Sequence, residues 1–478
     1  MSTNKRLVEE AFKSILAVDR MVVDELLENA LKTLNKKIIV LDDDPTGVQT
    51  VHDISVYTDW TLDSLEKGFA EDNSMFFILT NSRGFTAAET EDVHREIALH
   101  AVEAAKKANK EFIIISRGDS TLRGHYPLET NILKDTIESN STITFDGEVI
   151  MPFFKEGGRF TIDNIHYVQE NDYLIPAGET EFANDRTFGY THSHLGEWAE
   201  EKSEGEYKAD QMIYISLESL RNLELDSIEQ QLLKAKDFNK IIVNAVDYID
   251  VKIFVTALIN AMNKGKHFMF RSAAALTKVI GGVSDKPLLT REELIDENST
   301  NGGLVIIGSH VKKTTEQLEE LQKSNVIEFL EFNVHLVLEP EKFDKELTRI
   351  IETSNRLLSE GKNVAVFTRR ERLDLGEGKK EEELKLSVQI SDAVTSIVKR
   401  LQVKPSFIVA KGGITSSDIG TKGLEVKRAT VAGQIKPGIP VWTTGDESKF
   451  PGMAYIIFPG NVGTKTDLKE VVEMLNKK

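Results

Sequence analysis

The sequence predicts an α/β protein with two domains, each built around a mostly parallel sheet with flanking helices. Three observations lead to this prediction. Short apolar segments rich in β-branched residues alternate with longer amphipathic segments in both halves of the chain. Gly, Ser and charged residues directly follow several apolar segments, which is typical of the carboxyl ends of parallel strands. The length of 478 residues also exceeds what one hydrophobic core usually supports.

Three regions follow one another along the chain. Residues 1–35 form a helical extension, in which apolar side chains recur at helical spacing. We expect it to pack on the following domain or on a second subunit, which would give a homodimer. Residues 36–290 form the first α/β domain, and residues 291–478 form the second. The boundary between these domains lies in a polar segment that closes with two glycines.

The first domain repeats the order of strand, helix and strand that builds a parallel sheet. A polar stretch from 156 to 206 interrupts this order and predicts an inserted hairpin or lid. The second domain starts again with a strand and contains a long helix through 386–401. Strands are expected at 38–41, 76–80, 112–116, 149–154, 212–216, 240–247 and 267–272 in the first domain, and at 303–310, 363–368, 407–411 and 455–458 in the second.

The composition narrows the classes of function. A formal net charge of −18 argues against a general binder of nucleic acid or of membrane surfaces. The chain has no cysteine, so disulfides, thiolate nucleophiles and cysteine metal ligands are excluded. No apolar run is long enough to predict a signal peptide or a membrane span. We therefore expect a cytoplasmic protein whose ligands are small molecules.

An acidic turn follows the first predicted strand. Asp42, Asp43 and Asp44 come directly after the apolar run, and a proline and a glycine then favour a turn. Ligands of open α/β sheets bind at this edge. Three adjacent carboxylates there need hydroxyls, a metal ion or basic side chains to offset their repulsion. The alternative is a turn that only caps the next helix, although one carboxylate suffices for a cap.

Two basic loops follow the next two strands. Arg83 comes after the second strand, and the loop RGDSTLRGH, at 117–125, comes after the third. This loop carries Arg117 and Arg123 on either side of one aspartate and two hydroxyl side chains. Guanidinium groups suit carboxylate or phosphate, and Asp and Ser suit sugar hydroxyls, so the loop predicts a small polyhydroxy acid as ligand. In the alternative, structural interpretation, Asp119 only pairs with an arginine.

Glycine-rich turns follow three strands of the second domain. They contain Gly308–Ser309, Gly412–Thr415 and Pro459–Gly463. Such turns let backbone N–H groups approach phosphates. One turn alone is a weak signal, but three in a single domain favour a nucleotide. Neither a P-loop nor a dinucleotide fingerprint occurs in the sequence.

These motifs resemble those of the four-carbon acid sugar kinases. Asp43–Gly47 is similar to the D-D-x-T-G turn of that family, Arg117–Gly124 to its K-x-D-S-T-L-R-G loop, and Gly412–Thr415 to its G-G-x-T turn. The resemblance covers the chain from Ile38 to the C-terminus. Three features depart from the family pattern. Arg117 stands where the long loop usually has lysine, Pro459 begins a turn that is usually K-S-G-G, and the N-terminal extension is longer.

The resemblance implies an ATP-dependent kinase that phosphorylates a hydroxyl of a tetronate, such as erythronate, threonate or a 3-oxo-tetronate. The first domain would bind the sugar acid, the second would bind ATP, and the active site would lie in the cleft between them. Mg²⁺ would arrive with ATP, and no separate metal site is expected. The implied substrate-binding residues are Asp44, Arg83, Arg117, Gly118, Asp119, Ser120 and Arg123, and the implied ATP-binding residues are Ser309, Gly412, Gly413, Ile414, Thr415 and Gly460.

The mechanism of phosphoryl transfer assigns roles to these residues. The reaction depends mainly on positioning and on charge neutralisation. Arginines of the first domain would bind the substrate carboxylate, while Asp43 or Asp44 would orient or deprotonate the acceptor hydroxyl. We favour Asp44 for this role. Closure of the two domains would then complete the site.

Two other functions are compatible with parts of the sequence. In a haloacid-dehalogenase-like phosphatase, Asp42 would be the covalent nucleophile and Asp44 the general acid. That interpretation lacks a further acidic residue close after Asp119 and leaves the glycine turns without a role. The other alternative is a non-enzymatic, two-lobed sugar-acid binding protein, which predicts tetronate binding without any effect of nucleotides.

Overall fold

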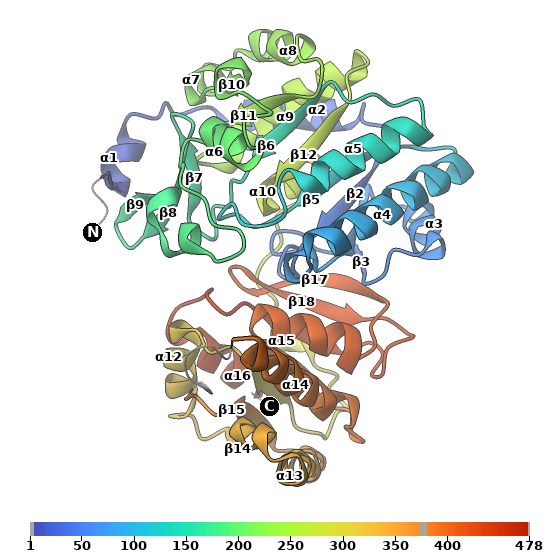
Figure 1. Ribbon diagram of the computed structural model, residues 1–478, viewed down its shortest axis with the longest axis vertical. Coiled ribbons are helices and arrows are strands. Elements are labelled where there is room, and N and C mark those ends of the chain that lie inside the picture. Colours follow the sequence, from blue (N-terminus) through green and yellow to red (C-terminus); the bar gives the residue numbers. More distant parts are fainter. Residues whose placement is uncertain (1–3, 372, 374–379, 477–478) are drawn as a thin grey trace. The chain divides into compact units, whose positions relative to one another are not determined.

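The computed structural model describes residues 4–371, 373 and 380–476 (Figure 1). The chain divides into two compact α/β units, as predicted: unit 1 comprises 1–47 and 59–285, and unit 2 comprises 48–58 and 286–478. Unit 2 thus includes a segment that the sequence analysis assigned to the first domain. The segment belongs there because its strand β3 (Ser55–Tyr57) pairs antiparallel with β17 (Arg428–Lys436).

A parallel sheet forms the centre of unit 1. Its strands lie side by side in the order β10, β11, β6, β12, β5, β2 and β4, and every neighbouring pair is parallel. Ile38, Ile39, Val40 and Leu41 are all buried because helices cover both faces of the sheet. The strands are β2 (Lys36–Asp42), β4 (Met75–Leu79), β5 (Glu111–Arg117), β6 (Gly147–Met151), β10 (Ile213–Ile215), β11 (Asn239–Val243) and β12 (Phe268–Ser272).

Two groups of helices cover this sheet. α3, α4 and α5 lie next to one another, and α2 packs with α8 and α10 around α9 (Figure 1). The extension thus packs on unit 1 through Val23, Leu27 and Ala30 of α2, which are buried. The helices of unit 1 are α1 (Val8–Lys13), α2 (Arg20–Leu31), α3 (Leu62–Ala70), α4 (Ala87–Ala108), α5 (Leu128–Asn140), α6 (Leu195–Lys202), α7 (Leu217–Arg221), α8 (Leu225–Leu233), α9 (Tyr248–Asn263) and α10 (Ala274–Ile280).

A small antiparallel sheet accounts for much of the polar insertion. Its order is β1 (Arg6–Leu7), β9 (Tyr173–Pro176), β8 (Ile165–Glu170) and β7 (Arg159–Ile162). The insertion is therefore a hairpin structure, which was one of the two expected forms. Leu7, which belongs to the predicted helical extension, lies in a strand instead, because β1 pairs with β9.

The sheet of unit 2 is parallel on one side and antiparallel on the other. β14, β15, β13, β16 and β19 are parallel neighbours, and β18, β17 and β3 continue the sheet as antiparallel strands. The sequence analysis assigned no strand to β3, β14, β17 or β18. The strands are β13 (Leu304–Ile307), β14 (Ile327–Phe332), β15 (Asn363–Thr368), β16 (Phe407–Lys411), β17 (Arg428–Lys436), β18 (Ile439–Thr444) and β19 (Ala454–Phe458).

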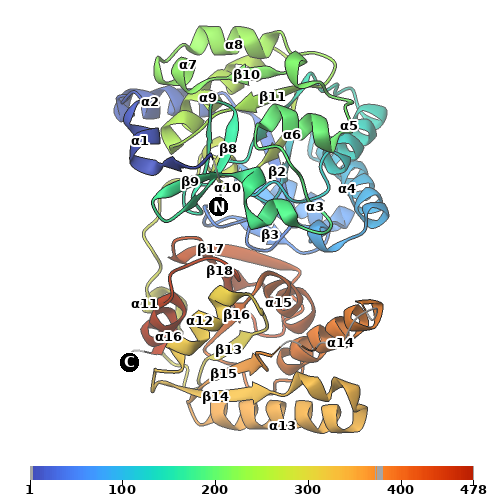
Figure 2. The same cartoon turned by 60° about the vertical axis from the view of Figure 1, so that its left-hand side comes forward.

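The helices of unit 2 also form two groups. α12 and α16 pack together and bury Leu318, Leu321 and Val471 against a cluster that includes Val305 and Val409 of the sheet. α13 packs against α14, and α14 against α15 (Figure 2). Within the described part of the chain, no helix is both long and apolar enough to cross a membrane. The helices are α11 (Arg291–Leu294), α12 (Lys312–Leu321), α13 (Pro340–Ser359), α14 (Lys380–Lys399), α15 (Gly413–Asp418) and α16 (Asp467–Asn476).

Candidate functional site

In unit 1, four neighbouring strands carry the predicted polar side chains to one edge of the sheet. The strands β12, β5, β2 and β4 lie in this order. Their register aligns Ser272 with Arg117, and Arg117 with Asp42. The acidic turn, the loop at 117–125 and the short 3-10 helix η1 (Ser82–Gly84) therefore all begin at the carboxyl edge. This is the edge at which parallel sheets bind ligands.

Asp43 and Arg83 form a buried, two-point ion pair. The Arg83 Nη2 atom lies 2.6 Å from Asp43 Oδ1, and Nε donates to Oδ2 at 3.1 Å. The Asp43 side chain is only 4% exposed. Burial raises the pKa of Asp43, while the Arg83 guanidinium opposes that shift. Because both carboxylate oxygens are engaged by Arg83, Asp43 is suited to fixing the arginine rather than to contacting a substrate.

Asp44 is the most accessible carboxylate of the acidic turn. Its side chain is 17% exposed. One oxygen accepts the backbone N–H of Thr46 at 2.8 Å, and the other lies 3.3 Å from Arg83 Nη1. Since the second contact is long, the oxygen can still accept a hydrogen bond from a bound hydroxyl. Asp44 thus differs from Asp42 and Asp43 in having a carboxylate oxygen that a ligand can reach.

Asp42 is enclosed beneath the turn. It is 1% exposed, and a Cβ atom added at Gly47 would lie only 2.0 Å from its Oδ1 atom. Burial raises the pKa of Asp42 well above its usual range, while Arg117, 3.5 Å away, opposes the shift. The phosphatase interpretation needs this carboxylate as an open nucleophile, so its burial argues against that function.

The loop at 117–125 is closed by its own ion pair. Arg123 Nε donates to Asp119 Oδ2 at 2.7 Å, and the Thr121 hydroxyl donates to the same oxygen. Burial alone would raise the pKa of Asp119. The guanidinium groups of Arg123 and Arg83 outweigh burial and hold this pKa well below its usual range. Asp119 is thus ionised and shapes the loop, as its structural interpretation predicts, while Arg123 keeps a side chain that is 22% exposed.

Arg271 lies under this loop, and the sequence analysis did not identify it. It belongs to β12, is 4% exposed and donates from Nη2 to the Arg123 carbonyl at 2.8 Å. A Cβ atom at Gly118 would lie 1.7 Å from Arg271 Nη1, so the loop requires glycine to pass over the guanidinium. A charged residue near the end of an apolar strand was the available signal.

Glu129 was also missed, because it lies on a helix rather than in a motif. Its carboxylate accepts the Ser82 hydroxyl at 2.8 Å and the Ser116 hydroxyl at 3.2 Å. These serines directly precede Arg83 and Arg117. Glu129, which is 2% exposed, therefore ties together the two strand ends that carry these arginines.

His166 connects the inserted sheet to the loop. Its Nε2 atom lies 2.8 Å from the Ser120 carbonyl, and its Nδ1 atom lies 3.0 Å from the Thr161 hydroxyl. The carbonyl can only accept, so Nε2 carries the hydrogen and Nδ1 accepts from the hydroxyl. Burial lowers the pKa of His166 to about 4, which keeps the ring neutral at neutral pH.

This histidine predicts a loss of stability in acid. The pKa of His166 is about 4 in the fold and 6.5 without its surroundings, so the unfolded chain binds more protons between these values. Stability is then complete above pH 6.5 and falls by about 2 to 3 kcal/mol as the pH drops towards 4. Urea unfolding of wild type and His166→Gln checks this contribution. The variant should show a shallower pH dependence, and an identical slope in both proteins would contradict the assignment.

In unit 2, the fold brings the predicted ATP-binding residues together. A Cβ atom at Gly412 would lie 2.9 Å from Ser309 Cβ, and one at Gly460 would lie 3.1 Å from Ser309 Oγ. A Cβ atom at Gly308 would lie 2.3 Å from Thr415 Oγ1. The turns after β13, β16 and β19 therefore meet at one place, where glycine permits close approach.

Gly413 and Ile414 are the other two predicted ATP-binding residues of the Gly412–Thr415 turn. Gly413 begins α15, and Ile414 is 76% exposed. Gly412 has φ +124°, a conformation that favours glycine. The fold thus leaves the Ile414 side chain free of the packing that holds the rest of the turn.

The protein itself offers no preformed metal cluster in the residues described. Within them, no group of three or more His, Asp or Glu side chains is arranged to hold an ion. The carboxylates of the acidic turn face arginines instead. Ser309 and Thr415 supply hydroxyls at the glycine turns, which suit phosphate oxygens or the water shell of a Mg²⁺ ion carried by a nucleotide.

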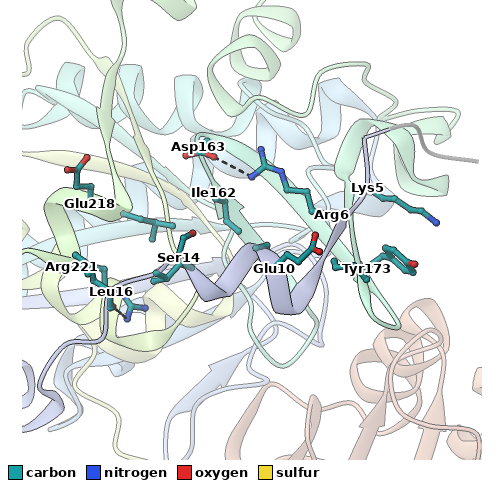
Figure 3. Close-up of a pocket in the computed structure, with 14 residues that line it drawn as sticks. Lys5, Arg6, Glu10, Ser14, Leu16, Ile162, Asp163, Tyr173, Glu218 and Arg221 are labelled. Carbon is teal, nitrogen blue, oxygen red and sulfur yellow. Dashed lines mark hydrogen bonds and ion pairs between the residues drawn. The ribbon is translucent and has the colours of Figure 1, made fainter.

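A separate hollow in unit 1 lies away from these residues. It measures about 780 Å³ and lies between α1 and the inserted sheet (Figure 3). Arg6 pairs with Asp163 at 3.4 Å, and Arg221 pairs with Asp250 and donates to the Leu16 carbonyl at 3.0 Å. Since these two cations already have partners, the hollow is a weaker candidate for anion chemistry than the sheet edge.

Comparisons with known proteins agree with the two-unit architecture. Residues 38–280 match the family model described as a sugar-binding N-terminal domain, and residues 304–468 match the one described as a nucleotide-binding C-terminal domain. No protein of curated function matches the chain.

Solved structures share the fold at low sequence identity. A Salmonella typhimurium LT2 protein, described provisionally as a tRNA synthase, has a TM-score of 0.65 and 15% identity, over 91% of this chain and 98% of its own. A Haemophilus influenzae protein of the DUF1537 family has a TM-score of 0.59 and 17% identity, over 91% of this chain and 100% of its own. At such identities, the likeness shows the fold alone.

Proposed function

Because the chain belongs to the four-carbon acid sugar kinase family, we propose that it phosphorylates a hydroxyl of a four-carbon sugar acid with ATP. The observation that carries this proposal is the position of Asp44 beside Arg83 at the carboxyl edge of the unit 1 sheet. A carboxylate that remains accessible next to fixed guanidinium groups can bind a molecule with both a hydroxyl and an acid group. Erythronate, threonate and 3-oxo-tetronates have this chemistry.

Substrate binding is assigned to the edge of unit 1. Arg83 and Arg123, which are 23% and 22% exposed, would contact the substrate carboxylate. Arg117 and Arg271 are more deeply buried, and the Nε atom of each has no hydrogen-bond partner within the described residues. Such unmet donors favour oxygen-rich ligands. Gly118, Asp119 and Ser120 would shape the loop around the sugar hydroxyls.

The reaction itself needs a proton acceptor and an aligned phosphate. Asp44 would take the proton from the acceptor hydroxyl of the substrate. The oxygen of that hydroxyl would form a bond to the γ-phosphorus, while the bond from this phosphorus to the β,γ-bridging oxygen breaks and ADP leaves. Ser309, Gly412, Gly413, Ile414, Thr415 and Gly460 would bind ATP, with backbone N–H groups and hydroxyls at the phosphates. Mg²⁺ bound to ATP would neutralise phosphate charge.

A panel assay tests this function. ADP formation should depend on ATP, on Mg²⁺ and on one of the tetronates, and should match the amount of phosphorylated acid found by mass spectrometry. Erythritol, which has the hydroxyls but no carboxylate, is the matched control and should give only background turnover. ADP formation that is equal with erythritol would refute the assigned role of the arginines, and the absence of turnover with every tetronate would refute the kinase proposal.

The non-enzymatic alternative makes a different prediction about nucleotides. A sugar-acid binding protein should be stabilised thermally by a tetronate but not by ATP with Mg²⁺. A kinase should be stabilised by each ligand, because each binds only the folded chain. Stabilisation by tetronate alone would favour the binding protein.

A further inference from the structure

Two basic side chains that the sequence analysis did not identify lie at the glycine turns of unit 2. Lys411 is the last residue of β16, and Arg370 follows the end of β15 by two positions. The strands β15, β13, β16 and β19 are neighbours and parallel, so both residues lie at the carboxyl edge of this sheet. Ser309 and Gly460 are the second residues after β13 and β19, at the same edge.

Lys411 is enclosed beneath the turn that follows β19. Its side chain has no exposed surface, and its Nζ atom donates to the carbonyls of Pro459 and of Gly460, the latter at 3.3 Å. The ammonium also lies 4.1 Å from the centre of the Phe458 ring. These partners are neutral, and the turn at 459–463 contains no charged residue of its own. Lys411 is therefore a basic group that the fold supplies to this turn from beneath.

Arg370 approaches the same place from the other side of Ser309. Its Nη2 atom donates to the Ser309 carbonyl at 2.7 Å and to the Thr315 hydroxyl at 2.8 Å. Its Nε and Nη1 atoms are buried and have no hydrogen-bond partner in the part of the chain that the structure describes. Buried guanidinium donors without partners are costly unless a ligand or water provides acceptors. A phosphate provides several acceptors in a geometry that arginine matches.

We propose that Arg370 and Lys411 form the cationic subsite for the phosphates of the bound nucleotide. Arg370 contacts a phosphate oxygen directly through its unpaired donors. Lys411 acts as a positioning residue, because it holds the turn at Pro459 and Gly460 and places a charge below it. This inference rests on the proposed nucleotide site and adds the side chains that neutralise the phosphates.

Occupation of the subsite is expected to change the protonation of Lys411. Burial, and to a smaller extent Lys313 of α12, lower its pKa to about 6, although Asp467 of α16 opposes the shift. The amine is then mostly neutral at pH 7.5 in the free protein. Phosphate anions favour the charged form, so they raise this pKa and draw one proton from solution. Affinity for the nucleotide should increase as the pH falls from 8.5 towards 6.5, by up to about tenfold per pH unit.

Isothermal titration calorimetry with the non-hydrolysable analogue AMP-PNP and Mg²⁺ tests both residues in the full chain. Titrations at pH 7.5 in two buffers of different ionisation enthalpy measure the protons that are taken up. Wild type should take up close to one proton, and Lys411→Met should take up none. Both Lys411→Met and Arg370→Gln should weaken binding by about tenfold or more, since Arg370→Gln removes a charge that contacts phosphate and Lys411→Met removes the basic group that lies below the turn.

Two neighbouring residues give matched controls. Arg369 precedes Arg370 but pairs with Glu371 at 3.2 Å, and Lys404 donates to the carbonyl of Pro451 at the surface, at 2.8 Å. Arg369→Gln and Lys404→Met change the same charges and should leave affinity within about twofold of wild type. Circular dichroism of each variant verifies that it folds. The proton uptake of wild type is measured without any variant, so it tests the inference even if a variant does not fold.

The outcomes separate this inference from the kinase proposal. Suppose that wild type binds AMP-PNP, and that both site variants bind it with an affinity within twofold of wild type and take up the same number of protons. The proposed cationic subsite is then wrong, while the nucleotide site stands. If the control variants weaken binding as much as the site variants, the effect is one of net charge and the subsite is again wrong. If wild type does not bind the analogue at all, the nucleotide site itself is refuted.

Discussion

The Asp44→Asn variant is expected to lose nearly all phosphoryl transfer, with kcat lower by about 10²- to 10⁴-fold. Asparagine keeps the shape of the side chain and can still accept the Thr46 N–H, but it cannot take a proton from the acceptor hydroxyl. Steady-state kinetics with the preferred tetronate measures the effect. Because arginines bind the carboxylate separately, KM for the acid should change by much less than kcat.

A surface aspartate provides the control for this substitution. Asp63 lies on α3, is 72% exposed and pairs with Lys67 one turn away. Asp63→Asn should leave kcat unchanged, because exposed pairs of this kind contribute little. Full activity in a folded Asp44→Asn protein would show that another group accepts the proton. Equal losses in both variants would point to a general effect on the fold.

Replacing Arg83 with methionine is expected to destabilise unit 1 by about 3 to 5 kcal/mol near pH 8 and to abolish tetronate binding. Arg83 is the two-point partner of Asp43, whose side chain is 4% exposed. Without Arg83, this buried carboxylate would lose its two-point partner and would keep the weaker electrostatic support of Arg117, at 3.7 Å, and of Arg271. Chemical unfolding followed by circular dichroism measures the loss of stability.

The destabilisation should depend on pH in a defined direction. Burial already raises the pKa of Asp43 in the fold, and loss of Arg83 raises it further. A carboxyl group with a raised pKa binds more protons when folded, so its cost grows as the pH rises through the folded pKa. Arg83→Met should therefore recover part of its stability between pH 8 and pH 5. A penalty that stays constant over this range would indicate that lost packing, not the buried charge, is responsible.

Arg95 is the matched control for Arg83. It pairs with Glu91 on the surface of α4, and its side chain is 48% exposed. Arg95→Met should change stability by less than about 1 kcal/mol, because solvent screens the pair. A comparable loss in both variants would contradict the special role of the buried pair.

The three aspartates of the acidic turn show what a motif can and cannot predict. The sequence placed all three at the carboxyl end of a strand, which is correct, because a short β-branched run followed by proline and glycine is a local signal. Their separate roles depend on burial: Asp42 faces Gly47, Asp43 faces Arg83, and Asp44 keeps an accessible oxygen. Burial depends on neighbours that are remote in sequence, so the motif alone could not assign it.

Arg271, His166 and Lys411 were not identified from the sequence, for a similar reason. Arg271 contacts a loop residue 148 positions away, and His166 contacts the Ser120 carbonyl 46 positions away. Each lies inside a strand, where a polar residue has no turn or repeated motif to mark it. Only their positions next to the predicted loops reveal what they hold in place.

By itself, the sequence determined the two α/β units, most parallel strands and the loops that carry the candidate site, because hydrophobic periodicity and turn chemistry are local properties. Tertiary structure alone decided that β3 joins unit 2, that Asp43 is a buried anchor while Asp44 is accessible, and that Arg370 and Lys411 each contact a glycine turn. These features arise from strand pairing and from desolvation, and both depend on contacts between segments that the chain order keeps far apart.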